Sequence, residues 1–260
     1  MAQELEKPVP PGAMMERPSF IPSSQEGTEH MEQEDVQIPR LSIAQQMSPE
    51  LEDGHSKFIG DLKVGEIFNS LTQKIYGKGP LDFAIVRASK PRWVEFAPRD
   101  EGGGVVDPDV PAGDERTEFW VDDFGKRRPP RATKFYDFVI VLDPENAREI
   151  VALSLKSTGI AVAKALNGLI KVRNAPLYAG IYRASSKSKK NAKGTFHQFN
   201  IQPAGWPKTE ETMKFMEELY RALKTKDVKI HTGGDGEEDD SFEFGANGEM
   251  SPGRDAGGEM

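Results

Sequence analysis

Lysine side chains without neighbouring carboxylates are the feature of this sequence that most directly indicates chemistry. From Val151 to Thr209 there is no Asp or Glu, whereas the same segment holds ten Lys or Arg residues. Ordinary protein surfaces intersperse both signs of charge. Because affinity for a polyanion comes largely from counterion release by cations, the pattern predicts polyanion binding, with a solvated charged surface as the alternative. The run SSKSKKNAKG is expected to be a flexible loop that follows a phosphate backbone through Lys187, Lys189, Lys190 and Lys193.

Tyrosines precede this lysine run at a spacing that suits base stacking. A strand over Leu177–Arg183 would place Tyr178 and Tyr182 on one face, because side chains four residues apart in a strand point the same way. Aromatic rings stack on successive bases without sequence preference, at about 1–3 kcal/mol per base. Trp93 and Trp120 are further candidates. The alternative for all these rings is packing in the core.

A second basic cluster occupies residues 126–134, KRRPPRATK. Arginine is the better bidentate partner for phosphate, so this cluster could clamp a backbone, or it could equally be a solvent-exposed turn. The complete predicted nucleic-acid surface therefore comprises Arg127, Arg128, Arg131, Lys156, Lys164, Lys171, Arg173, Tyr178, Tyr182, Arg183, Lys187, Lys189, Lys190 and Lys193.

The C-terminal segment has the opposite charge. Residues 235–260 carry nine acids and Arg254, a net charge of −8, which equals that of the whole chain and leaves the remainder neutral. Two phenylalanines inside an acidic, glycine-rich segment favour a docking function over simple solubilisation, because such a segment combines reach, charge and an apolar anchor. The tail is expected to bind partners and to mask the protein's own basic groove through Glu237, Glu238, Asp239, Asp240, Phe242 and Phe244.

Alternating and helical patterns indicate the elements that position these side chains. The run FYDFVIVL (135–142) is the most strand-like and is expected to pair with Ile150–Leu155 after a turn. Residues 81–88 and 92–96 are expected to form a hairpin around Ser89–Pro91, and 101–116 a loop. Helices are predicted over 159–170 and from Thr209 to about 226, the second with an apolar stripe. That stripe comprises Met213, Met216, Tyr220 and Leu223.

These elements predict a mainly β protein with two helices, arranged as an OB-fold-like β-barrel. A curved open sheet with helices on one side is the alternative. Residues 36–228 would form this domain, between a disordered acidic N-terminal segment (1–35) and a disordered acidic C-terminal tail (229–260).

Several function classes find no support in the composition. The chain has no cysteine, and its four histidines show no ligand spacing, so no metal site and no cofactor is predicted. We found no phosphate loop or hydrolase motif, and the basic block lacks the carboxylates that a metal-dependent nuclease needs, so an enzyme is not expected. No secretory signal and no apolar run long enough for a membrane span is present, which predicts a cytoplasmic protein.

Two stretches also carry a resemblance to phage proteins. FYDFVIVLDPENAREIVALSLKSTGIAVAKALNGLI and GTFHQFNIQPAGW look like a group of phage replication-region proteins. The layout of a basic β-rich core and an acidic tail with phenylalanine resembles the single-stranded DNA-binding proteins of tailed bacteriophages, including the T7 type. In this sequence sixteen residues follow Phe244, which departs from the T7-type tail that ends in its aromatic residue.

The resemblance implies an OB barrel that coats and protects single-stranded DNA during replication, recombination and repair in the host cytoplasm. It also implies a tail that recruits replication proteins such as polymerase or helicase-primase. RNA binding and a homodimer are compatible with it. The alternatives are a phage structural or assembly protein and a strand-annealing recombination mediator.

Overall fold

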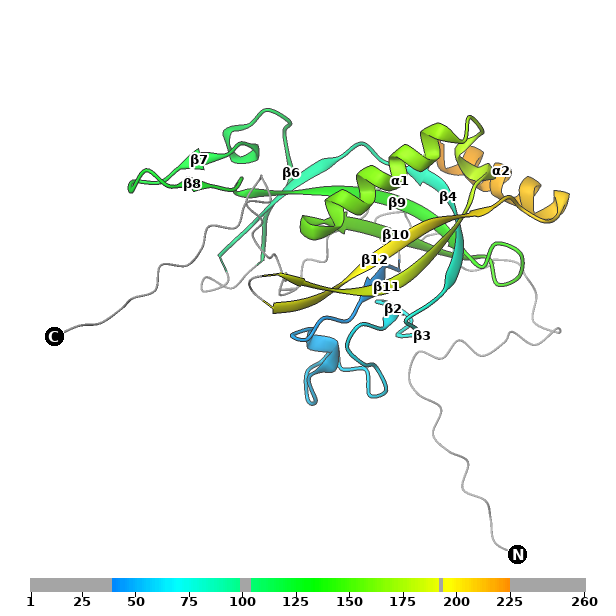
Figure 1. The fold of residues 1–260 in the computed structure, drawn as a ribbon, viewed down its shortest axis with the longest axis horizontal. Coiled ribbons are helices and arrows are strands. Elements are labelled where there is room, and N and C mark those ends of the chain that lie inside the picture. Colours follow the sequence, from blue (N-terminus) through cyan, green and yellow to red (C-terminus); the bar gives the residue numbers. More distant parts are fainter. Residues whose placement is uncertain (1–38, 99–103, 192–193, 225–260) are drawn as a thin grey trace, which may run out of the picture.

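The computed structural model describes residues 39–98, 104–191 and 194–224, and the two expected disordered segments lie outside these ranges. A seven-stranded antiparallel sheet forms the centre of the protein (Figure 1), with the strands ordered β12-β11-β4-β9-β5-β6 and β10 also paired to β9. The mainly β class with two α-helices is therefore confirmed. In the described ranges no helix is long and apolar enough to cross a membrane.

Strand β9 (Ala132–Leu142) lies at the centre of the sheet and organises it. Its alternate residues Val139 and Val141 face one side while Phe138 and Ile140 face the other, and all four are buried because both faces are covered. Strand β10 (Glu149–Lys156) pairs with it in register from Glu149↔Leu142 to Lys156↔Phe135, as predicted.

The expected hairpin between β4 (Leu81–Ala88) and β5 (Arg92–Phe96) is wrong, although both strands are present with the predicted bounds. They follow one another along the same edge of β9, to which both are antiparallel. The Ser89 N–H still donates to the Asp137 carbonyl at 3.0 Å. Residues 89–91 therefore form a bulge in one long strand, a position that tolerates Pro91 because its nitrogen has no hydrogen to donate.

On the edge of this long strand away from β9, its two halves pair with different strands. Strand β11 (Ile181–Asn191) pairs with β4 and with β12 (Gly194–Gly205), whereas β6 (Val105–Val110) pairs with β5. Strand β6 lies in the segment that was expected to be a loop. Its Pro108 is compatible with an edge strand, which leaves one side of its backbone unpaired.

A small sheet of β1 (Leu41–Ile43), β2 (Ile67–Asn69) and β3 (Ile75–Gly77) lies beside the gap between β10 and β12. Arg40 bridges to Ala152 of β10, and the Gln45 side chain bonds the His197 N–H and carbonyl of β12 at 2.9 and 2.8 Å. No strand ladder in the described ranges joins β10 to β12. The sheet is curled but not closed, so the OB-fold barrel is not confirmed.

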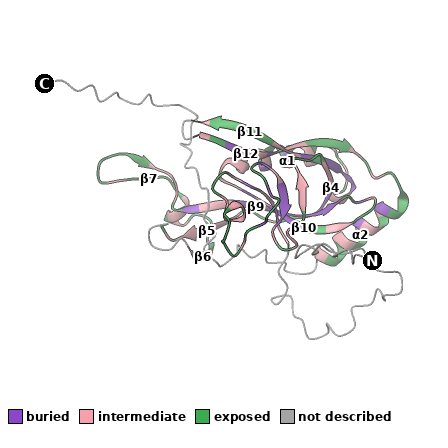
Figure 2. Ribbon diagram, turned by 90° about the horizontal axis from the view of Figure 1, so that it is seen from below, coloured by how far each residue is buried: buried purple, intermediate pink, exposed green. Residues whose placement is uncertain are grey.

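The two α-helices cover opposite faces of the sheet, which corrects the alternative that placed them on one side. Helix α1 (Ile160–Val172) buries Ala163 and Leu166 against the cluster of Phe83, Phe138 and Ile140. Helix α2 (Glu210–Lys224) buries Met216 on the other face. Figure 2 shows the buried residues concentrated in the strands between the helices, with exposed residues toward the tips of the hairpins.

Helix α2 begins as the sequence predicts, because the Thr209 Oγ1 accepts from the Thr212 N–H at 3.1 Å. Its apolar stripe is rotated from the predicted one: Phe215, Leu219 and Leu223 accompany Met216 against the sheet. The remaining described elements are the short strands β7 (Trp120–Val121) and β8 (Arg127–Arg128) and the 3-10 turns Pro49–Leu51, Glu115–Thr117, Ser157–Gly159 and Leu177–Ala179.

Candidate nucleic-acid interface

The predicted lysine loop is part of a β-ribbon. Strand β4 pairs with β11 only as far as Ala184, and the Ser186 N–H makes a last bond to the Lys78 carbonyl at 2.9 Å. From Lys187 onward β11 pairs only with β12, from Lys187↔Gln198 to Asn191↔Gly194. We call this projecting part, residues 187–191 and 194–198, the lysine ribbon. Lys193 lies outside the described residues.

The three described lysines of the ribbon are exposed and occupy both of its faces. Side chains alternate along a strand, so Lys187 and Lys189 point to one face and Lys190 to the other. Within the described residues none of the three makes an ion pair. The ribbon therefore presents cations that no carboxylate among the described residues neutralises, as an arrangement for contacting a polyanion requires.

Arg183 lies near the start of the same strand, β11, and its charge is neutralised by an ion pair. Its Nε and Nη2 donate to the two carboxylate oxygens of Asp82 at 2.6 and 2.8 Å. This bidentate hydrogen bond holds the pKa of Asp82 below its usual value. Asp82 is 101 residues away in sequence, so a reading of the acid-free segment alone overestimates the charge that Arg183 contributes.

Arg173 also has intramolecular partners, at the base of the β11–β12 hairpin. Its guanidinium donates to the carbonyls of Gly205 at 2.7 Å and Ile181 at 2.8 Å, and it lies over the rings of Tyr182 and Trp206. A Cβ on Gly180 would come within 2.5 Å of the Arg173 Nη1, so a larger residue there would displace the guanidinium. These contacts give Arg173 a structural role in fixing the end of α1 to the hairpin.

The structure does not place Tyr178 and Tyr182 on one strand. Tyr178 lies in the 3-10 turn before β11 and packs against Tyr220 of α2, with 5.1 Å between ring centroids. Tyr182 is only 1% exposed and packs against Phe83 on the opposite face of the sheet. Burial also raises its pKa. The two rings do not form a stacking platform together, because Tyr178 lies in the turn Leu177–Ala179 and Tyr182 in the strand that follows it.

The other cations of the acid-free block are spread over several elements. Lys164 and Lys171 are exposed on α1. Lys156, at the end of β10, lies over the rings of Phe96 and Phe135. A pocket of about 240 Å³ lies between β1, β10 and β12, beside Lys156 and the base of the lysine ribbon.

The second basic cluster is paired with aromatic rings. The Arg127 guanidinium lies 4.4 Å from the ring centroid of Phe119, and that of Arg131 lies 4.9 Å from the Trp120 ring. Arg128 differs, because its Nε donates to Asp122 at 2.8 Å. We call residues 118–131, which include β7, β8 and the turn between them, the aromatic arm.

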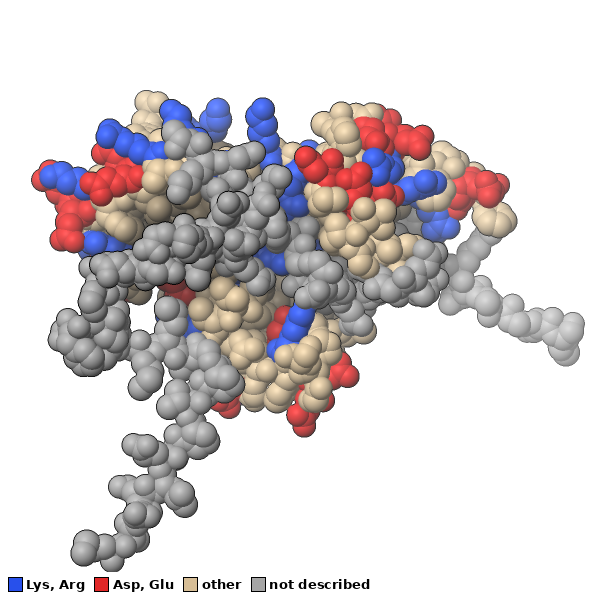
Figure 3. Space-filling model, turned by 180° about the vertical axis from the view of Figure 1, so that it is seen from behind, with Lys and Arg blue, Asp and Glu red and all other residues tan. Residues whose placement is uncertain are grey.

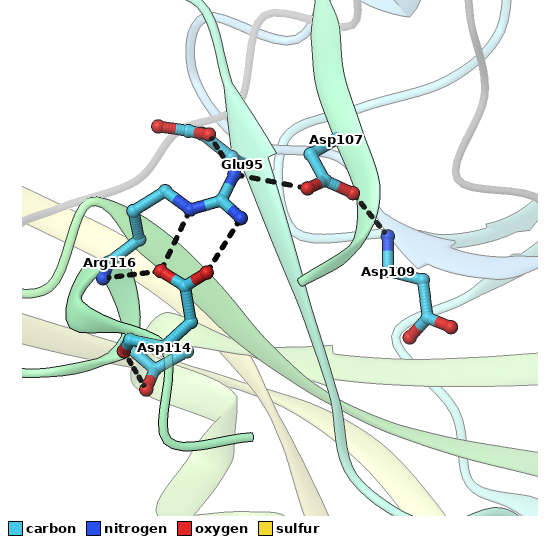
Figure 4. Close-up of polar contacts among 6 residues, drawn as sticks. Glu95, Asp107, Asp109, Asp114 and Arg116 are labelled. Carbon is cyan, nitrogen blue, oxygen red and sulfur yellow. Dashed lines mark hydrogen bonds and ion pairs between the residues drawn. The ribbon is translucent and has the colours of Figure 1, made fainter. Parts of the chain in front are cut away.

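A carboxylate network fixes the base of the aromatic arm (Figure 4). Arg116 binds both oxygens of Asp114, at 2.9 and 2.8 Å, and reaches Glu95 at 2.8 Å and Asp107 at 3.0 Å. The side-chain hydrogen bond from Arg116, followed by its backbone N–H, lowers the pKa of Asp114 to about 2. One guanidinium thus gathers acids from β5, β6 and the turn that leads into β7. No group of acidic or histidine side chains in the described ranges is arranged to hold a metal ion.

The lysine ribbon and the aromatic arm project from the same end of the molecule, opposite α2, in both Figures 1 and 2. On the face seen from behind, acidic and basic side chains are intermingled at both ends (Figure 3). We therefore take the two projections, with their exposed lysines and aromatic rings, as the candidate interface.

One family of known proteins matches most of the chain. The model of the family described as Pam3 phage gp34-like protein matches residues 12–229, which is more than four-fifths of the chain. The chain belongs to this phage protein family. No curated protein and no solved structure matches the chain significantly. The family membership makes this a phage protein and leaves the more specific T7-type resemblance a hypothesis.

In this member of the phage family, the matched segment ends at residue 229, before the acidic tail. The tail residues Glu237 to Phe244 also lie outside the described residues. The exposed rings of Phe119 and Phe124 were not predicted from the sequence. The signal that could have identified them is the run FWVDDFGKRR, in which aromatic residues directly precede the basic cluster.

Proposed function

We propose that this phage protein binds single-stranded DNA through the lysine ribbon and protects it during DNA replication and recombination. The observation that carries the proposal is the set of three exposed lysines on a projecting ribbon, with no ion pair to any described residue. A ribbon two strands wide can follow a flexible single strand, and its cations gain affinity by releasing counterions from the phosphates. Its place of action would be the host cytoplasm.

Charge neutralisation of the ribbon tests this proposal. In the variant Lys187→Ser, Lys189→Ser, Lys190→Ser, we expect weaker binding to oligo(dT) and a salt dependence that is shallower by about 2 in log K against log salt. That expectation follows from a slope of about −0.7 per phosphate contact on single strands. Fluorescence anisotropy across a salt series measures both quantities.

A matched control separates local charge from net charge. The variant Lys208→Ser, Lys214→Ser, Lys224→Ser removes three lysines before and within α2, at the opposite end of the molecule, and changes the net charge by the same amount. We expect it to bind nearly as well as the unaltered chain. Equal losses in the two variants would contradict a site on the ribbon.

The acidic tail is proposed to recruit replication proteins and to compete with DNA for the ribbon. The charge of −8 on residues 235–260 of this tail and its two phenylalanines support this assignment, because a polyanion with apolar anchors can occupy a cationic site. Removing residues 229–260 should therefore tighten DNA binding at low salt. A phage assembly protein would instead show stable self-association and no salt-sensitive binding to oligonucleotides.

A further inference from the structure

The aromatic arm exposes more apolar surface than its own stability requires. Phe124 is 94% exposed at the tip, and Phe119 and Trp120 are 39% and 38% exposed. Burying an aromatic side chain is worth about 1.5–3 kcal/mol, so the fold gains little from holding these rings in water. Large aromatic side chains that are exposed together on one short arm indicate an interaction site.

The arm is built to hold these rings in place. The Asp122 carboxylate accepts from the N–H groups of Phe124 and Lys126 at 3.0 and 2.8 Å, and from Arg128 at 2.8 Å. Gly125 adopts a φ of 76°, which a residue with a side chain rarely adopts. The turn is therefore fixed by its own hydrogen bonds, and it presents Phe124 without a covering residue.

Cations lie beside the rings of the aromatic arm. This combination favours a nucleic acid as the occupant of the arm over an apolar protein surface. Arg127 and Arg131 each lie over one face of a ring, Phe119 and Trp120, and both arginines are exposed. Residues 118–131 hold four basic and three acidic side chains, so the net charge of the arm is only +1. Such a surface would contribute stacking rather than counterion release, because counterion release scales with the number of cations that meet phosphates.

We propose that the aromatic arm is a base-stacking platform for single-stranded nucleic acid, in which Trp120 and Phe124 contact bases while the lysine ribbon contacts phosphates. This inference rests on the proposed function, and it adds a second site with a different physical signature. Stacking on the arm should depend on the presence of bases and be insensitive to salt. Binding to the ribbon should depend on salt and be insensitive to the loss of bases.

The test uses the full chain with oligo(dT) and an abasic oligonucleotide of the same length. We expect the unaltered protein to prefer oligo(dT), and the variant Trp120→Ala, Phe124→Ala to lose about tenfold or more in affinity for oligo(dT) only, with an unchanged salt slope. Trp206→Ala is the control, because Trp206 is also exposed and lies over an arginine but belongs to the α2 end. Its base preference should stay as in the unaltered protein.

The outcomes separate the inference from the proposed function. If the unaltered protein binds oligo(dT) and the arm variant binds it equally well, the stacking platform is wrong while the ribbon stands. If the unaltered protein binds no oligonucleotide, both are wrong. If the arm variant instead loses self-association in sedimentation, with unchanged DNA affinity, the arm is a contact between copies of this chain and the inference is overturned. Unchanged thermal unfolding of the variant shows that the fold is intact.

Discussion

The Asp137 carboxylate is buried where β4 passes into β5, and two side chains hold it there. The Arg92 Nε donates to it at 2.7 Å and the Ser154 hydroxyl at 2.6 Å, while only 2% of the Asp137 side chain is exposed. A buried charge of this kind is tolerated only when it is paired and hydrogen-bonded. Arg92 therefore stabilises the bulged strand at the centre of the sheet.

Removal of the Arg92 guanidinium should leave the buried Asp137 carboxylate without a cationic partner. We expect Arg92→Ala to lower the free energy of unfolding by about 3 kcal/mol, measured by urea denaturation. The exposed pair of Arg183 and Asp82 provides the comparison, because Arg183→Ala should cost less than about 1 kcal/mol. Equal costs for the two variants would contradict a buried role for Arg92.

The positions of the cationic and aromatic residues can be read from the sequence. Which of them have intramolecular partners cannot. Arg183 meets Asp82 and Arg173 meets the Gly205 carbonyl, and both partners are distant in sequence. Tyr182 lies between Ile181 and Arg183, a local pattern that does not show which side is exposed, and in the structure its face is covered by α1. Partners of this kind follow from the tertiary fold and not from local pattern.

At the scale of elements, the base of the aromatic arm depends on the Arg116 network. The pKa of Asp114 is lowered to about 2, mainly by the hydrogen bond from Arg116. Because this pKa lies below the unfolded value of about 3.9, the network stabilises the arm above about pH 4 and is lost as the pH falls toward 2. At neutral pH the arm is therefore held in place with all of its contacts.

A carboxyl titration tests this assignment. We expect the NMR signal of the Asp114 carboxyl carbon to titrate with a midpoint near 2. In Arg116→Met the midpoint should rise toward the ordinary value of about 3.9. A midpoint near 4 in the unaltered protein would show that the Arg116 contacts do not form in solution.

Sequence patterns predict most elements of the fold. They fail where a segment with a proline is compatible with more than one structure. The pairing of β9 with β10 follows from alternation, and both α-helices follow from the helical spacing of their apolar residues. The Thr209 cap of α2 forms, whereas the N-cap of α1 is Gly159, which makes no side-chain hydrogen bond. Ser89–Pro91 suits a hairpin turn as well as a bulge, and only the pairing of both flanking strands with β9 distinguishes them. Strand β6 was missed because Pro108 and its acids resemble a loop.

At the scale of the whole molecule, exposed cations and exposed aromatic rings lie on two different projecting elements. The lysine ribbon carries cations without an ion pair to any described residue, the aromatic arm carries exposed rings, and both project from the end opposite α2. The overall charge of −8 equals that of residues 235–260 alone, so it gives no information about this end. The curled but open sheet could not be distinguished from a closed barrel by sequence, because closure depends on whether β10 and β12 pair.

The measurement that tests single-strand binding most directly is fluorescence anisotropy of labelled oligo(dT) and a matched duplex across a salt series. The full chain and a chain ending at residue 228 should both be titrated. We expect salt-sensitive binding with strong preference for the single strand, and tighter binding by the shorter chain at low salt. Absence of binding by both chains, or equal affinity for the duplex, would contradict the proposed function.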